Sequence, residues 1–102
     1  MNRGEVWWAE DPAKGRRPHL ILTRDTAIPV LRYVLVVPAS RTIRGAPTEV
    51  LLDEDDGMPE RSALLFDNVT VIWKGLLTDR ICRLGVDRMA EVCRALRVAT
   101  AC

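Results

Sequence analysis

The chain has 102 residues, 48% of them hydrophobic, with 15 basic side chains, 14 acidic side chains and one histidine. This length supports one compact domain with a genuine core and leaves no room for a second, so we predict a single domain over residues 1–102. No apolar stretch approaches the roughly 18 residues that span a bilayer, and the N-terminus lacks a basic-then-apolar signal region. The composition therefore predicts a soluble, cytoplasmic protein with no membrane partner.

Cysteine and histidine usage limits the chemistry. The three cysteines, Cys82, Cys93 and Cys102, are odd in number and lack C-x-x-C or His-rich spacing. This pattern indicates neither a disulfide framework nor a zinc site, and a single histidine disfavours a His-based metal centre. We expect chemistry without a metal or cofactor, carried by arginine, carboxylate or hydroxyl groups.

Charge is placed unevenly along the chain. Five of the 14 acids lie in the segment DEDDGMPE, residues 53–60, and the remaining sequence has more basic than acidic side chains. The acidic segment is typical of a solvated loop. The basic remainder permits a polyanionic partner without requiring one.

Three apolar segments in the first half are expected to form strands: Glu5–Ala9 (EVWWA), Pro18–Arg24 (PHLILTR) and Arg32–Pro38 (RYVLVVP). The polar connection 10–17 carries a proline and a glycine and should be an exposed loop. The third segment is a continuous β-branched run, as in a strand covered on both faces, and Pro38 should end it.

Four further short strands are expected in the second half, at Thr48–Leu52, Ser62–Phe66, Val69–Trp73 and Arg80–Leu84. After these strands the spacing of the apolar residues changes from that of a strand to that of a helix, and Asp87 can cap a C-terminal helix. The apolar positions of this helix recur at three and four residues: Met89, Val92, Cys93, Leu96 and Ala99. Its arginine face is more typical of a solvated surface than of an RNA platform. Short, closely spaced strands favour a small barrel or sandwich with one helix.

Arg17 is the first candidate for chemistry. Pro18 pushes the preceding residue toward an extended conformation at the entrance of a strand. A guanidinium there is always charged and offers a planar fork of donors that suits phosphate. An ordinary surface arginine near a turn is the alternative.

Further polar residues follow other apolar strands. Ser40 and Arg41 come directly after the apolar run 33–39, where a hydroxyl can donate to phosphate and Arg41 and Arg44 can hold flanking phosphates. Asp67 and Asn68 also follow an apolar strand, where an amide can read a base edge and a carboxylate can orient an arginine. Each signal is weak alone, and an ordinary polar turn would look the same.

Taken together and in this order, these segments resemble the MazF/PemK family of toxin endoribonucleases from bacterial toxin–antitoxin systems. The matching segments are RGEVWWA at 3–9, RPHLILTRD at 17–25, VVPAS at 36–40, SRTIRGAPTEV at 40–50, SALLFDNVTVI at 62–72 and LTDRICRL at 77–84. No single motif is specific, but the ordered set covers nearly the whole chain.

The resemblance implies a mainly β fold with a C-terminal helix, a small SH3-like barrel shared with CcdB. It also implies a homodimer that cuts single-stranded RNA without a metal and is neutralised by a cognate antitoxin. The main catalytic arginine of the family falls on Arg17, and the hydroxyl of its V-P-x element, usually threonine, falls on Ser40. Its acidic-amide pair falls on Asp67 and Asn68, and Arg16 is expected to attract the RNA backbone.

The first loop departs from the family pattern. Many members carry a longer insertion there, which contributes a Glu or His to the site, whereas here Gly15 runs directly into Arg16. His19 is a candidate base because residues 17 and 19 of a strand face the same side, although a partly buried spectator is the favoured interpretation. Trp7 and Trp8 should point to opposite faces, and neither is assigned to RNA.

Two alternatives from other classes stay open at this point. One is a CcdB-like topoisomerase poison that cuts nothing, for which Arg17 and Ser40 would be dispensable. The other is a catalytically inactive family member that serves only as a binding module. Cleavage of RNA by the protein in the absence of metal would support a nuclease and exclude both alternatives.

Overall fold

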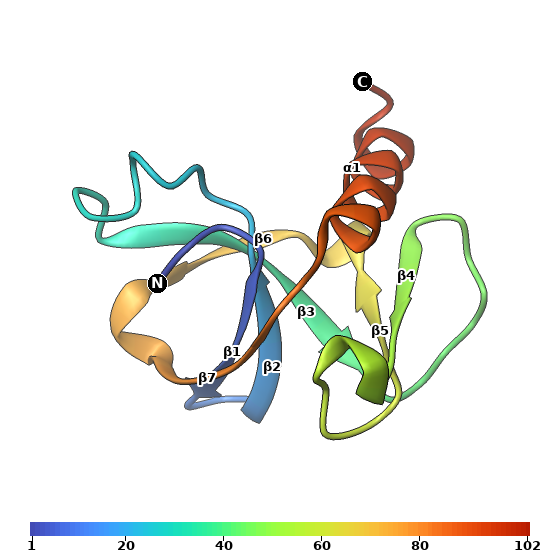
Figure 1. Ribbon diagram of the computed structural model, residues 1–102. Helices are drawn as coiled ribbons and strands as arrows, with labels where there is room; N and C mark the ends of the chain where they lie inside the picture. The colour runs from blue at the N-terminus through green and yellow to red at the C-terminus, as the bar shows by residue number, and fades with distance from the viewer.

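A computed structural model describes all residues 1–102 as a strongly bent antiparallel sheet with one C-terminal helix (Figure 1). The strands are β1 (Glu5–Asp11), β2 (Gly15–Ile21), β3 (Tyr33–Ser40), β4 (Glu49–Leu52), β5 (Ser62–Leu65), β6 (Thr70–Trp73) and β7 (Leu77–Arg83). Three short 3-10 turns, η1 (Glu54–Asp56), η2 (Phe66–Asn68) and η3 (Lys74–Leu76), precede the helix α1 (Val86–Thr100).

β3 organises the sheet because it pairs with three other strands. The strand order is β4-β5-β3-β2-β1-β7, and β6 pairs with β3 outside this path. The sheet does not close on itself, so the predicted mainly β fold with a C-terminal helix is confirmed while "barrel" describes it only loosely. None of the helices is long and apolar enough to cross a membrane.

The β1–β2 connection is tighter than the sequence suggests. An exposed loop over 10–17 is expected, but the strands extend to Asp11 and Gly15, which pair with each other. The Asp11 carboxylate accepts the N–H groups of Ala13 at 2.8 Å and Lys14 at 3.2 Å, which closes the turn. Gly15 takes the left-handed conformation with φ +83°, as a three-residue hairpin loop requires.

The expected end of β3 at Pro38 is wrong, because the strand continues to Ser40 by changing partners. Ala39 pairs with Leu64 and Ser40 pairs with Ala63, on the opposite edge from β2. The pairing with β5 on that edge carries the strand past a residue that cannot donate to the ladder. The expected coverage of both faces is also wrong at the start of the strand, where Tyr33 is exposed.

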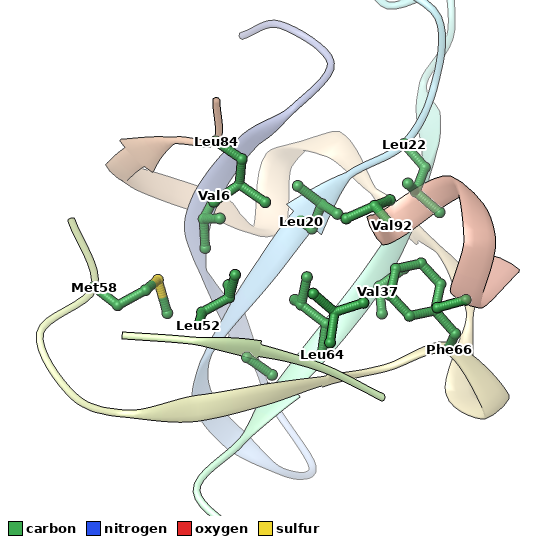
Figure 2. Close-up of a cluster of buried hydrophobic side chains, with 13 residues drawn as sticks. Val6, Leu20, Leu22, Val37, Leu52, Met58, Leu64, Phe66, Leu84 and Val92 are labelled. Atoms are coloured by element: carbon green, nitrogen blue, oxygen red, sulfur yellow. The ribbon is translucent and has the colours of Figure 1, made fainter. Parts of the chain in front are cut away.

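The main core lies inside the bend of the sheet, where α1 covers it (Figure 2). Met58 lies at one end of this cluster, and Phe66 lies at the other end beside the helix residue Val92. The buried members are Val6, Leu20, Leu22, Val37, Ala39, Val50, Leu52, Met58, Leu64, Phe66, Leu84, Val92 and Ala95. The expected helix therefore packs on the sheet, although its N-cap is Gly85 and Asp87 lies in its first turn.

The acidic segment 53–60 is an ordered turn joined to the helix. Asp53 and Asp56 form a capping box around η1. The guanidinium of Arg88 on α1 donates two hydrogen bonds of 3.0 Å each to the Asp56 carboxylate. Burial by itself would raise the pKa of Asp56, but the bonds from Arg88 and Asp53 outweigh it and hold that pKa below its ordinary value.

We expect Asp56→Asn to lower the free energy of unfolding at pH 7 by about 1–3 kcal/mol, because the charge-assisted hydrogen bonds between the Arg88 guanidinium and this carboxylate are lost. A carboxyl whose pKa is depressed by folding stabilises the fold above its unfolded pKa and loses that effect as pH falls through the folded pKa. The difference between wild type and variant should therefore shrink below about pH 4. Urea unfolding at pH 7, 4 and 3 measures it.

Asp55→Asn is the matched control, since Asp55 is an exposed acid of the same turn with no ion pair. Its effect should stay within about 0.5 kcal/mol. An Asp56→Asn variant as stable as wild type at pH 7, or a difference that does not change with pH, would contradict the assignment.

Candidate nucleic-acid groove

Two prolines separate the ends of β2 and β3. His19 pairs with Pro38 in the antiparallel register, so the next pair would be Pro18 with Ala39, and the one after it Arg17 with Ser40. Consecutive antiparallel pairs alternate between hydrogen-bonded and non-bonded. Both His19–Pro38 and Pro18–Ala39 contain a proline, which has no N–H to donate. Whichever pair is bonded, one ladder bond is missing, and the regular β2–β3 pairing stops at His19.

A groove of about 630 Å³ opens where these strands part. Its lining residues come from the middle of β1, the β1–β2 turn and the start of β2, the end of β3 and the residues after it, the chain after η1 and the start of β5: Trp8, Lys14, Arg16, Arg17, Pro18, Ala39, Ser40, Arg41, Thr42, Met58, Pro59, Glu60 and Ser62. Four of them are basic and one is acidic, so the groove attracts anions.

Arg17 and Ser40, predicted from separate motifs, lie on the lining of this one groove. The half-buried guanidinium of Arg17 makes no ion pair and no side-chain hydrogen bond within the chain, so all of its donors are available. The Ser40 Oγ accepts the backbone N–H of Thr42 at 3.1 Å, which leaves its own proton free to donate. Both residues therefore have donors free for an anion bound in the groove.

Arg16 differs from Arg17 because its charge is already balanced. Its guanidinium lies 3.1 Å from a Glu10 carboxylate oxygen and 2.8 Å from an Asp79 carboxylate oxygen, and it stacks over the Trp8 ring at 4.5 Å from the ring centre. An arginine with two carboxylate partners adds little net attraction for RNA. It instead fixes the wall of the groove beside Arg17.

The opposite wall is held only weakly. Arg41 and Glu60 are both largely exposed, and their closest charged atoms are 3.5 Å apart. Such an exposed pair contributes little to stability and can exchange partners when a charged ligand arrives.

His19 lies just below the groove and does not line it. Its ring is only 8% exposed, and its Nδ1 is 3.0 Å from the backbone oxygen of Arg17. A carbonyl can only accept, so Nδ1 carries the proton and donates. Burial lowers the pKa of His19 below its ordinary 6.5, and this hydrogen bond only partly opposes the effect. The imidazole fits a neutral structural group that supports the Arg17 backbone.

Three other predicted residues lie away from the groove. Asp67 and Asn68 are exposed on η2, and Asp67 accepts a hydrogen bond of 2.7 Å from the Thr48 hydroxyl without pairing with any arginine. Arg44 is exposed in the loop before β4, and its backbone N–H donates to Glu49 at 3.1 Å. The structure contains no group of three or more His, Cys, Asp or Glu side chains placed to hold a metal ion.

The sequence motifs do not single out four other residues that line the groove, Trp8, Lys14, Met58 and Ser62. The alternation of β1 could have indicated Trp8, which pairs with Pro18. No local signal places Ser62, because it reaches the groove through the β3–β5 pairing.

The fold and the groove define a small β domain with an anion-attracting cleft of the kind that binds a nucleic-acid backbone. The chain matches the PemK-like, MazF-like toxins of type II toxin–antitoxin systems over residues 2–100, and it belongs to that family. The resemblance inferred from the sequence is thereby confirmed.

Individual relatives agree with the family. The chain is 48% identical to a "Probable endoribonuclease MazF5" of Mycobacterium tuberculosis strain H37Rv, over 98% of this chain and 93% of the relative. It is 38% identical to "Probable endoribonuclease MazF2" of the same strain, over the full length of both.

Solved structures show the same fold. The "Mycobacterium tuberculosis toxin MazF-mt6" superposes with a TM-score of 0.88 at 31% identity, covering 95% of this chain and 96% of that one. An "Endoribonuclease in complex with its cognate antitoxin from Mycobacterial species" gives a TM-score of 0.90 at 25% identity, covering 99% and 95%.

We expect His19 to titrate with a midpoint below 6.5, because its imidazole is buried beside the Arg17 charge. Since the folded pKa lies below the unfolded one, the unfolded chain binds the proton first, and stability should fall as pH drops below about 6.5. His19 is the only histidine, so one proton NMR titration of its ring protons measures the midpoint. The control is His19→Gln, whose stability should lack this pH dependence. A midpoint at or above 6.5 would contradict the assignment.

Proposed function

We propose that this chain is an endoribonuclease toxin that cuts single-stranded RNA at short sequence motifs without a metal ion. The observation that carries the proposal is an unpaired Arg17 guanidinium that lines the same basic groove as the Ser40 hydroxyl. Membership in the MazF-like toxins and the names of its endoribonuclease relatives support it.

Cleavage requires the ribose 2′-oxygen to attack the adjacent phosphorus while the bond to the 5′-oxygen breaks. One proton leaves the 2′-hydroxyl and one reaches the departing 5′-oxygen, which yields a cyclic phosphate and a free 5′-hydroxyl. Arg17 stabilises the charge that grows on the phosphoryl oxygens, and Ser40 orients the same phosphate. Arg17 remains protonated throughout, because its pKa above about 12 makes it a poor base.

The proton steps need a different group. Glu60 is the only carboxylate among the lining residues, and it is the one that can accept the proton of the 2′-hydroxyl. His19 is a poor alternative because its ring is buried and already donates to a carbonyl. Asp67 and Asn68, outside the groove of this protomer, stay as candidate base-reading residues for an RNA that extends beyond it.

A cognate antitoxin is the second partner that we propose for this protein, after RNA. A related endoribonuclease has been solved with its cognate antitoxin. An extended acidic segment of such an antitoxin would complement the basic groove and would exclude RNA from it.

The third element of the proposal is a homodimer built on β3 and β6. Tyr33 pairs with Trp73 and Leu35 pairs with Val71, and all four side chains are exposed. Large apolar side chains gathered on one sheet face indicate an interface. A C2 dimer would bury this face against itself and would place one groove on each subunit.

We expect Arg17→Ala to lower the cleavage rate of single-stranded RNA in EDTA by at least about 100-fold, because a preorganised donor to the phosphoryl oxygens is lost. Arg17→Lys keeps the positive charge but loses the planar fork of guanidinium donors, so its cleavage rate should lie between those of wild type and Arg17→Ala. Gel analysis of a long RNA with purified protein measures the rates.

Arg94→Ala is the control, since Arg94 is an exposed arginine of α1 outside the groove, and it should cut within about threefold of wild type. RNA left intact by wild type would reject the nuclease and favour a CcdB-like poison or an inactive binding module. Cleavage that survives Arg17→Ala would reject the assigned role of Arg17 alone.

We expect Val71→Asp to convert the dimer into a monomer, because it places a charge in a desolvated apolar interface. The matched control is Val98→Asp on α1, since Val71 is 56% exposed and Val98 is 54% exposed. Sedimentation velocity should show twice the mass of one chain for wild type and control, and one chain mass for Val71→Asp. A wild-type protein that is monomeric at all concentrations, or a dimeric Val71→Asp, would contradict this interface.

A further inference from the structure

Ser62 has a buried hydroxyl without a partner. The residue is 5% exposed, and its Oγ is the one buried side-chain nitrogen or oxygen in the chain that forms no hydrogen bond. Buried polar atoms are nearly always paired, since an unpaired one loses its bonds to water without replacement. Because Ser62 also lines the groove, its missing partner can come from a molecule bound there.

The position of Ser62 separates it from the proposed phosphate contacts. Ser40 pairs with Ala63, so one further step in the register sets Arg41 opposite Ser62. Side chains alternate along a strand, and Ser62 therefore shares its face with the core residue Leu64, whereas Ser40 belongs to the other face. Ser62 lies where the inner face of the bent sheet reaches the groove.

The surroundings of Ser62 suit an uncharged group. Arg41, its neighbour across the strands, is 82% exposed and lies 3.5 Å from the Glu60 carboxylate, so it faces solvent, whereas the Ser62 hydroxyl is buried. The apolar side chains on the groove lining are Trp8, Ala39 and Met58; Ala39 and Met58 are 3% and 4% exposed, and Trp8 is partly exposed. A partly exposed aromatic ring suits the face of a nucleobase. Met58 also lines the groove and is unbranched, so its side chain can adapt to a bound ligand.

We propose that Ser62 is a specificity-determining residue that hydrogen-bonds the edge of a nucleobase next to the cleaved phosphate. The inference rests on the proposed nuclease function and adds to it a residue that reads sequence. While Arg17 and Ser40 hold the phosphate of any sequence, the Ser62 hydroxyl selects among the bases that enter the inner end of the groove.

The test compares wild type, Ser62→Ala and Ser40→Ala on a pool of single-stranded RNA of random sequence in EDTA, with the 5′ ends of the products sequenced. Ser62→Ala should still cut but lose roughly tenfold in discrimination at one position of the motif, as the loss of one base-edge bond predicts. Ser40→Ala should slow cleavage of every sequence and leave the motif unchanged.

Thermal unfolding excludes a merely structural role. Ser62→Ala removes a hydroxyl that has no partner in the free protein, so its melting temperature should equal or exceed that of wild type. A stable Ser62→Ala variant with an unchanged motif, or with a uniform loss over all sequences, would overturn this inference alone. A destabilised variant with an unchanged motif would overturn it as well. RNA left uncut by wild type would overturn the nuclease function and this inference with it.

Discussion

The site depends on the missing backbone donors of Pro18 and Pro38. They lie on neighbouring strands at positions where the antiparallel ladder would require an N–H from one or the other. Pairing of β2 with β3 therefore stops at His19, and β3 continues by pairing with β5 on its other edge. Arg17 and Ser40, two residues beyond the last pair, belong to regular strands and line an open groove.

Charge within the groove is divided among arginines with different surroundings. Arg16 is balanced by Glu10 and Asp79 and stacks on Trp8, so it contributes rigidity. Arg17, the next residue, lines the groove and has no ion-pair partner. A guanidinium whose hydrogen-bonding capacity is unused in the free protein suits the proposed role of binding a charge that arrives with substrate. Adjacent and chemically identical side chains thereby have different surroundings.

The sequence predicted what short-range rules control. Strand content and the C-terminal helix follow from apolar runs and their period. Arg17 and Ser40, singled out by Pro18 and by motif order, line one groove, and their catalytic roles stay predictions. The end of β3 was missed because the pairing that carries the chain past Pro38 comes from β5, which is distant in sequence. Asp67, proposed from the sequence to orient an arginine, lies on η2 and instead accepts a hydrogen bond from Thr48. Ser62 was missed because its significance lies in an absent hydrogen bond, which only the packed structure reveals.

We expect the groove between β2 and β3 to receive the phosphate that is cleaved. A crystal structure with RNA that lacks the attacking 2′-hydroxyl at the cleavage position tests this role most directly. The phosphate should accept hydrogen bonds from both the Arg17 guanidinium and the Ser40 hydroxyl, with donor–acceptor distances of about 2.7–3.1 Å. A phosphate bound elsewhere on the protein, with Arg17 facing solvent, would contradict this role of the groove.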